Sequence, residues 1–151
     1  MDVSIVIPTK NGGNLFDEVL TAIDQQKTKY SFEVICVDSG SSDQTIETIK
    51  KHHCILKQIP KEEFGHGKTR NLGASLGTGE YIIFITQDAK PASNKWLENF
   101  INAMKLDESV VGGFGIHYPY PDCNLLDKRD LYYHFKGFGE DNTIYYLEDK
   151  E

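Results

Sequence analysis

The sequence lacks long hydrophobic runs and a net positive charge, and each absence excludes a class of protein. Its 151 residues carry a formal net charge of -7, which argues against a broad binding surface for nucleic acid or for an anionic membrane. The chain enters its first apolar run, residues 3–7, directly, and we find neither a signal peptide nor a membrane span. We therefore expect a cytoplasmic protein that binds no nucleic acid, and any association with the inner face of the cell membrane would be peripheral.

Cysteine is also scarce. The three cysteines, Cys36, Cys54 and Cys123, are odd in number and far apart, and their spacing is not that of a metal site. Cys36 and Cys54 lie in apolar runs, where a small buried residue is a simpler interpretation than a redox role. Cysteine use is therefore that of a protein in a reducing compartment.

Several nucleotide and hydrolase motifs are missing. No G-x-G-x-x-G follows the first apolar run and no G-x-x-x-x-G-K-[ST] occurs, so neither a dinucleotide fold nor a P-loop is supported. No G-x-S-x-G elbow is present. His52, His53 and His66 lack the partners of a zinc site. A nucleotidyltransferase would need a glycine-rich loop with an arginine after the first strand, and Gly12 and Gly13 have no arginine near them.

What the sequence does contain is a regular alternation of strand and helix patterns. This alternation predicts right-handed βαβ crossovers and one α/β domain, with a mostly parallel sheet flanked by helices. Ser41 and Gln44 have the spacing of a capping box at the start of the second helix. We expect strands at residues 3–7, 32–37, 54–59, 81–85 and 110–115. We expect helices at residues 15–26, from the Ser41 capping box through Ile49, at residues 69–76 and at residues 96–104.

The apolar run at residues 81–85 gives way abruptly to a polar cluster that contains one carboxylate, Asp88. A short unbroken apolar run predicts a strand buried on both faces, in the centre of a parallel sheet. Ligands of such sheets bind beyond the carboxyl ends of the strands. We therefore expect Asp88 at the mouth of a site.

Other predicted strands deliver polar groups to the same edge. Thr9 and Asn11 follow the first strand, and Asp38 ends the second. Each acid taken singly is better explained as a turn former or helix cap, but two acids and a threonine at one edge favour a nucleotide site. Lys68 and Arg70 can offset phosphate or base charge, and the alternative for both is a solvated helix face.

Four ordered motifs carry a family likeness. Residues 4–11 (SIVIPTKN), 37–43 (VDSGSSD), 69–73 (TRNLG) and 79–82 (GEYI) resemble the family 2 glycosyltransferases, which have the GT-A fold, a Rossmann-like nucleotide-diphospho-sugar transferase fold. Residues 64–71 (FGHGKTRN) and 86–89 (TQDA) with Pro91 resemble, more narrowly, the bacterial rhamnosyltransferase branch. The likeness covers roughly residues 2–135.

The resemblance implies roles for individual residues. Asp38 would bond the base of the donor, with Arg70 beside it. Asp88 takes the last position of the D-x-D motif, whose role is to hold the Mg²⁺ or Mn²⁺ that bridges the donor diphosphate, while Thr86 replaces the first aspartate, as is typical of the branch. The implied metal ligand is Asp88, and the implied donor-binding set is Pro8, Thr9, Asn11, Asp38, Lys68, Arg70, Thr86, Gln87 and Asp88.

The implied reaction is inverting transfer of a sugar from a dTDP- or UDP-sugar to a glycan or lipid-linked acceptor, in cell-surface polysaccharide synthesis. Rhamnose is implied by the branch likeness alone. The catalytic base belongs to the second half of the family's domain. This chain has acidic pairs at residues 140–141 and 148–149, and we expect neither pair to supply that base. No catalytic residue is identified in this chain.

We therefore expect residues 1–117 to be a nucleotide-sugar-binding domain and residues 118–151 to begin an incomplete acceptor-side region, in a truncated protein or the product of a split gene. The alternative is a half-domain that binds a nucleotide-sugar and is inactive on its own. If a sheet edge near residues 110–116 lacks its cover, we also expect self-association.

Overall fold

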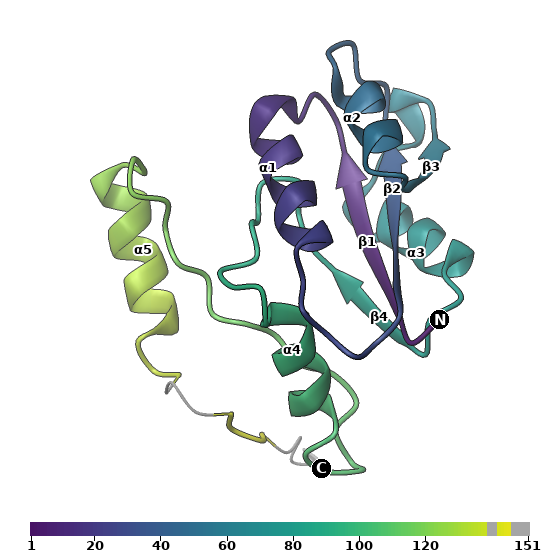
Figure 1. The fold of residues 1–151 in the computed structure, drawn as a ribbon. Helices are drawn as coiled ribbons and strands as arrows, with labels where there is room; N and C mark the ends of the chain where they lie inside the picture. The colour runs from purple at the N-terminus through teal and green to yellow at the C-terminus, as the bar shows by residue number, and fades with distance from the viewer. Residues whose placement is uncertain (139–141, 146–151) are drawn as a thin grey trace, which may run out of the picture. The chain divides into compact units, whose positions relative to one another are not determined.

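The computed structural model describes residues 1–138 and 142–145 (Figure 1). Its contacts divide the chain into two compact units, Met1–Asn99 and Phe100–Glu151. The elements are β1 (Val3–Thr9), α1 (Gly13–Asp24), β2 (Phe32–Asp38), α2 (Thr45–Lys51), β3 (Ile55–Gln58), a 3₁₀ turn η1 (Lys61–Glu63), α3 (His66–Leu76), β4 (Tyr81–Phe84), α4 (Trp96–Met104) and α5 (Leu125–Phe135).

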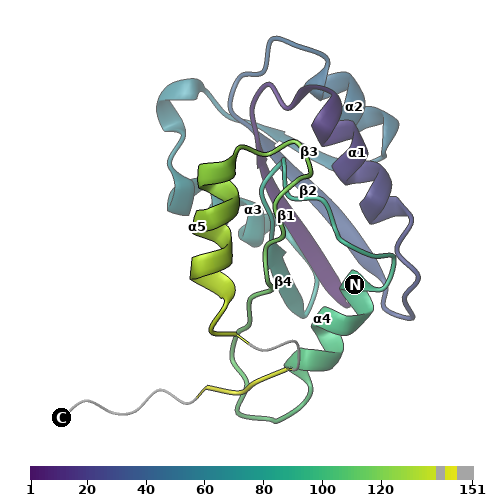
Figure 2. The ribbon, with the colours of Figure 1, turned by 90° about the vertical axis from the view of Figure 1, so that its left-hand side faces the viewer.

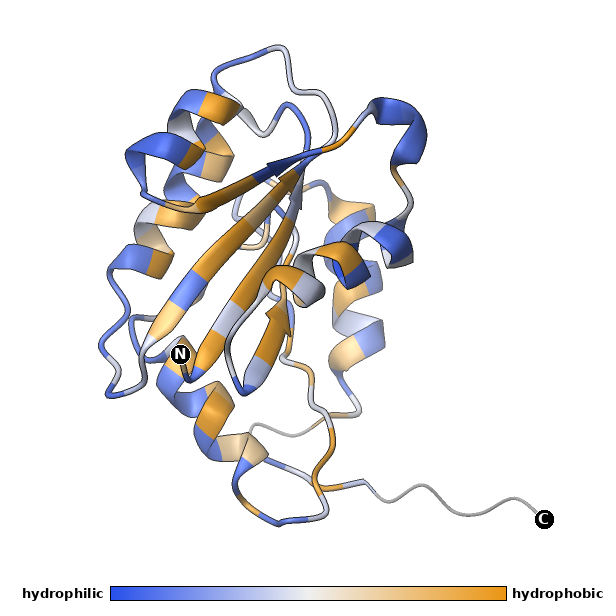
Figure 3. Ribbon diagram, turned by 90° about the vertical axis from the view of Figure 1, so that its right-hand side faces the viewer, coloured by the Kyte–Doolittle hydropathy of each residue, from blue (hydrophilic) through white to orange (hydrophobic). Residues whose placement is uncertain are grey.

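The first unit is built on a four-stranded sheet with the order β3-β2-β1-β4, in which every pair is parallel. This confirms the predicted parallel α/β sheet. Helices α1 and α2 cover one face and α3 covers the other (Figures 2 and 3). Strand β1 lies between β2 and β4, and its residues 3–7 are all buried, with the polar Ser4 among four apolar residues.

The two helical layers bury apolar side chains against the sheet. On α1 the buried residues recur at helical spacing, so that one stripe faces the core: Phe16, Val19, Leu20 and Ile23. Helix α3 packs against β1 and β2 through Gly73, where an added Cβ would lie 2.3 Å from Val6 Cγ1. Glycine at position 73 therefore sets the short distance between α3 and the sheet.

The predicted capping box at the start of α2 is wrong. Helix α2 begins at Thr45, and Gln44 makes no side-chain cap bond. Its amide donates to Asn14 Oδ1 at 2.9 Å instead, while Asp43 Oδ1 accepts the Thr45 N–H at 3.0 Å. Ser41 is not available as a cap, because its hydroxyl binds Asp38.

The prediction that residues 81–85 form a central strand buried on both faces is also wrong. Strand β4 ends the sheet and pairs only with β1 among the described strands. Ile83 is 5% exposed, but Ile82 and Phe84 on the opposite face are 36% and 45% exposed. Hydrophobicity predicted a strand here correctly, but an apolar run does not reveal how many neighbours its strand has.

The predicted strand at residues 110–115 is absent, since the structure assigns neither strand nor helix to any of these residues. Gly112, Gly113 and Gly115 fall within the run, and glycine weakens a strand that has no neighbour to pair with. The outer edge of β4 is therefore the apolar edge of the described sheet.

The second unit contains α5, whose first turn is capped by Asn124. The Asn124 Oδ1 accepts the N–H groups of Leu126 and Asp127, each at 3.0 Å. Helix α5 buries none of its residues. None of the helices in the described part of the chain combines the length and the apolar character that a membrane crossing requires. The predicted functional division after residue 117 remains a prediction.

Candidate functional site

The buried carboxylate of Asp38 organises the end of β2. Its Oδ1 accepts the N–H groups of Gly40 at 3.0 Å and Ser41 at 2.9 Å. Its Oδ2 accepts the hydroxyls of Thr9, at 3.4 Å, and of Ser41. A carboxylate has about four acceptor positions, so the protein itself occupies them here. A nucleotide base that bonded Asp38 would have to replace one of these donors.

The loop that follows β1 is joined to the loop that follows β2 through Asn11. Asn11 has a left-handed φ of 48°, which an asparagine tolerates better than most residues. Its N–H donates to Ser41 Oγ and its Oδ1 accepts the Ser42 N–H, both at 2.8 Å. Asn11 is exposed, so this bonded loop reaches the surface.

Two further bonds hold the same pair of loops. Gly12 N–H donates to Thr45 Oγ1 at 2.8 Å, and Gly13 N–H donates to Asp43 Oδ2 at 3.1 Å. Hydrogen bonds from the Thr45 hydroxyl and from the Thr45 and Gly13 amides lower the pKa of Asp43 from its ordinary value. The start of α1 and the start of α2 are thereby fixed to each other.

The loop that follows β4 is joined to β1 by a side-chain amide. Gln87 Oε1 accepts the Lys10 N–H at 2.8 Å, and Gln87 Nε2 donates to the Lys10 carbonyl at 3.1 Å. The ends of β1, β2 and β4 are therefore brought together as the sequence predicted, through contacts that it did not predict.

Asp88 and Thr86 are exposed in this loop, which turns back at a 3.1 Å bond from the Ala89 N–H to the Thr86 carbonyl. No group of three or more His, Cys, Asp or Glu side chains that could hold a metal exists among the described residues. The donors present fit a magnesium or manganese ion held by one carboxylate and completed by phosphate oxygens and water. They do not fit a site made of protein ligands alone.

Lys68 and Arg70 lie in the first half of α3. The end of this helix lies beside Ser4 at the amino end of β1, where an added Cβ on Gly77 would be 2.7 Å from Ser4 Oγ. Its first turn therefore lies toward the carboxyl ends of the strands. Lys68 is exposed, and Arg70 donates to the His66 carbonyl on its own helix at 3.1 Å. No bond in the described part of the chain joins either side chain to the strand-end loops.

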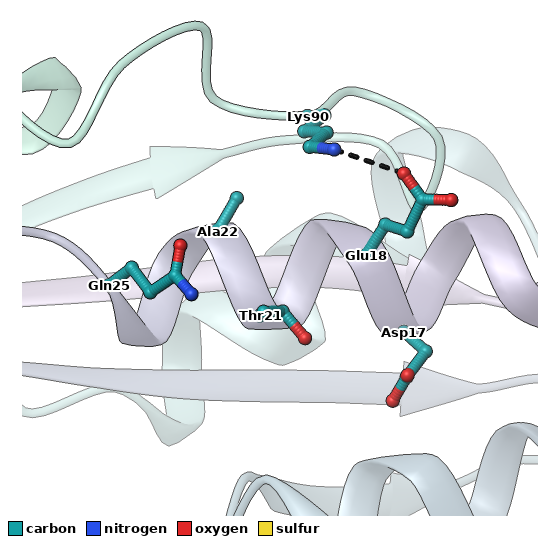
Figure 4. A pocket seen from close by; sticks show the side chains of 6 residues that line it. All are labelled: Asp17, Glu18, Thr21, Ala22, Gln25 and Lys90. Carbon is teal, nitrogen blue, oxygen red and sulfur yellow. Dashed lines mark hydrogen bonds and ion pairs between the residues drawn. The ribbon is translucent and has the colours of Figure 1, made fainter.

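Two hollows of the first unit lie away from the strand-end loops. One of about 150 Å³ runs along α1, and Figure 4 shows Lys90, from the loop after β4, paired with Glu18 at 3.0 Å. The other, of about 370 Å³, lies at the amino end of β2 and near the start of β3, lined by Met1, Asp24, Phe32, Glu33, Val34, His52, His53, Cys54 and Ile55. Neither includes a predicted donor-binding residue.

Sequence reasoning missed the residues that hold the predicted site together. Ser41, Asp43 and Thr45 bond the loop after β1, and Lys10 presents its main chain to Gln87. Their only signal was their position within the motifs. The acidic pairs at 140–141 and 148–149 both lie outside the described residues.

Solved glycosyltransferases have the same fold. The first is Staphylococcus aureus TarS 1–349 in complex with UDP, with a TM-score of 0.63 and 27% identity over 70% of this chain and 32% of TarS 1–349. The second is the mannosyltransferase PcManGT of Pyrobaculum calidifontis, in complex with GDP-Man and Mn²⁺, with a TM-score of 0.60 and 26% identity over 71% of this chain and 33% of PcManGT. The sheet and its flanking helices are the GT-A fold.

Residues 4–148 match the model of glycosyl transferase family 2, and the chain belongs to that family. A curated relative is the O-antigen chain rhamnosyltransferase RfbN of Salmonella typhimurium. It is 37% identical over 128 residues, which are 83% of this chain and 40% of RfbN. The predicted family and rhamnosyltransferase likeness are confirmed, and the chain spans less than half the length of this relative.

Proposed function

We propose that the chain is the donor-binding half of a glycosyltransferase that moves a sugar from a nucleoside diphosphate to a glycan or lipid-linked acceptor with inversion, in cell-surface polysaccharide synthesis. The observation that carries the proposal is the exposed carboxylate of Asp88, in a loop tied to the ends of two neighbouring strands. Similarity to a rhamnosyltransferase favours rhamnose as the sugar.

In this proposal the strand-end loops bind the donor. Asp88 would hold a magnesium or manganese ion, which supplies positive charge to the leaving diphosphate. Pro8, Thr9, Asn11, Thr86 and Gln87 belong to the segments that surround the donor. Arg70 contacts its base, and the base replaces one of the present donors to Asp38. Lys68, which is exposed on α3, adds positive charge near the phosphates. A cytoplasmic location, or peripheral association with the inner face of the membrane, is part of the same proposal.

Calorimetric titration tests the donor site. We expect UDP or dTDP to bind in the presence of Mn²⁺, and Asp88→Asn to remove the manganese-dependent part of the binding. Asp130→Asn is the matched control, because it neutralises another exposed carboxylate, on α5, and changes the net charge equally. Equal binding by the Asp88 variant and the unaltered chain would contradict the proposal.

The alternative function is a half-domain that binds the nucleotide-sugar without transferring it. The implied catalytic base is not assigned to any residue of this chain, which favours this alternative for the isolated chain. An assay that follows both donor binding and release of the nucleoside diphosphate in the presence of acceptor glycan separates the two. Binding without release supports the half-domain, and acceptor-dependent release supports the complete enzyme.

Self-association is proposed at the outer edge of β4, in place of the edge expected near residues 110–116. Strand β3 carries Lys57 on the other edge of the sheet, and charge of this kind hinders edge-to-edge pairing. Strand β4 carries no charge and exposes Ile82 and Phe84. We expect a second copy to pair there, and a constant molar mass across a wide concentration range in light scattering would contradict this.

A further inference from the structure

The pairing of β1 with β4 stops at a proline. Tyr81 N–H donates to the Asp2 carbonyl at 3.0 Å, and Ile85 N–H donates to the Val6 carbonyl at 3.2 Å. In a parallel ladder the next bond would run to the Ile85 carbonyl from the N–H of residue 8. That residue is Pro8, which has no N–H. The main chain therefore cannot form the next bond of the ladder after Ile85.

Gln87 restores the pairing with its side chain. Its amide carries the same donor and acceptor as a peptide group, and it meets both main-chain groups of Lys10, at 2.8 Å and 3.1 Å. The two residues are 77 positions apart in the sequence. The side chain is half-buried, so this pair of bonds is partly shielded from water.

This amide pair joins the two segments that the donor site requires. Gln87 lies between Thr86 and Asp88, and Lys10 lies between Thr9 and Asn11. We propose that Gln87 is a positioning residue, which fixes the Asp88 carboxylate relative to the Thr9–Asn11 loop and does not itself contact the donor. The inference rests on the proposed function, and it replaces the role in donor contact that the family likeness gave to Gln87.

A pair of glutamine variants tests this role. Gln87→Met keeps the length of the side chain and removes both bonds. The control is Gln26→Met, because the Gln26 amide also joins main-chain segments outside the proposed donor site. Gln26 Nε2 donates to the carbonyls of Ala22 at 3.0 Å and Ser93 at 2.8 Å, and Gln26 Oε1 accepts the Leu97 N–H at 3.0 Å. Gln87→Asn, which shortens the side chain by one methylene, serves if Gln87→Met does not fold.

The first measurement is the dissociation constant of UDP or dTDP with Mn²⁺, beside the exchange rate of the Lys10 amide proton. We expect Gln87→Met to weaken binding about ten-fold, as loss of an orienting partner commonly does, and to speed exchange at Lys10. Gln26→Met should leave both values unchanged while it lowers the melting temperature. Unchanged binding in Gln87→Met, with binding lost in Asp88→Asn, would overturn the positioning role and leave the proposed function standing.

The second measurement separates positioning from direct contact. If Gln87 acts through Asp88, then adding Gln87→Met to Asp88→Asn should cost no further affinity, because the two effects are coupled. Additive losses would mean that Gln87 contacts the donor itself, and would overturn the proposal. Full binding by Asp88→Asn alone would overturn the proposed donor site and the positioning role together.

Discussion

The two ends of the sheet use hydrogen bonds for different purposes. At the amino end, Glu33 Oε1 accepts the Ser4 hydroxyl at 2.7 Å and both the N–H and the hydroxyl of Thr78, at 2.7 Å and 2.8 Å. At the carboxyl end, the bonds join loops to one another and leave Thr86 and Asp88 exposed. At the amino end the polar groups thus bond one another and stabilise the fold. At the carboxyl end they hold the loops so that Thr86 and Asp88 remain at the surface.

At the amino end the main chain before β4 also lies very close to the main chain of β1. An added Cβ on Gly79 would lie 2.5 Å from the Ser4 nitrogen and 2.6 Å from the Val3 carbonyl carbon, both main-chain atoms of β1. No side-chain rotation can relieve such a contact. Substitutions at this end should therefore reduce stability and leave the nucleotide affinity of the folded chain unchanged. Substitutions at the carboxyl end should reduce nucleotide affinity and leave stability nearly unchanged.

The largest effect on stability is expected for Gly79→Ala. It should cost about 3 kcal/mol of unfolding free energy, as severe overpacking does, because β1 and the chain before β4 would have to separate. Urea denaturation measures this loss. Gly67→Ala on α3 is the control, since nothing lies within 4 Å of its added Cβ, and it should stabilise the helix slightly. Equal stabilities of the two variants would contradict the role of the Gly79 contact in stabilising the amino end of the sheet.

A smaller effect is expected for Glu33→Gln. Burial raises the pKa of Glu33, but the hydrogen bonds from Thr78 and Ser4 outweigh it and bring the pKa below its ordinary value of 4.5. A carboxyl whose pKa falls on folding stabilises the protein above its unfolded pKa, and this stability is lost as the pH falls through the folded pKa. We expect the variant to lose about 1 kcal/mol at pH 7.

The pH dependence of this loss is the diagnostic. Unfolding curves of Glu33→Gln and of the unaltered chain, recorded from pH 7 to pH 3, should converge as the pH falls below 4.5. Other carboxyls with lowered pKa values, such as Asp17 and Asp43, destabilise both proteins equally in acid. A difference that stays constant across this range would mean that the charge of Glu33 does not contribute.

The smallest effect on stability is expected for Asp88→Asn. Its side chain is exposed, and such surface substitutions change stability by about 0.5 kcal/mol or less. The same variant should have the largest effect on manganese-dependent binding of UDP or dTDP. Denaturation and calorimetry on one preparation check both, and a marked loss of stability would show that the carboxyl end also closes the fold.

Much of the fold could be predicted from the sequence, because the buried face of a helix or strand determines the spacing of its apolar residues. The apolar runs of β1 and β2 and the helical spacing of Val19, Leu20 and Ile23 reflect how each element is covered. Strand order leaves no such mark. The run at residues 81–85 therefore predicted a central strand where the structure has an edge, and residues 110–115 predicted a strand that is not there.

The site was predicted in part, for a similar physical reason. Polar residues that follow parallel strands meet at one edge, and Thr9, Asp38 and Gln87 do so. Side-chain bonds to the main chain of a distant loop follow no period, so the roles of Ser41 and Gln87 were missed. For Gln87 one signal was Pro8, since a proline at the end of an inner strand leaves a pairing position to be filled by another group.

The central position of β1 also determines the order in which the chain can fold during synthesis. It is made before the other three strands of this sheet, yet its partner β4 follows it by most of the first unit. At about 5–20 residues per second, the 77 positions between Lys10 and Gln87 take about 4–15 s to translate. Until then one edge of β1 has no partner. The donor site is thus the last part of the sheet to assemble, and a nascent chain paused before residue 87 would be a natural client for a chaperone.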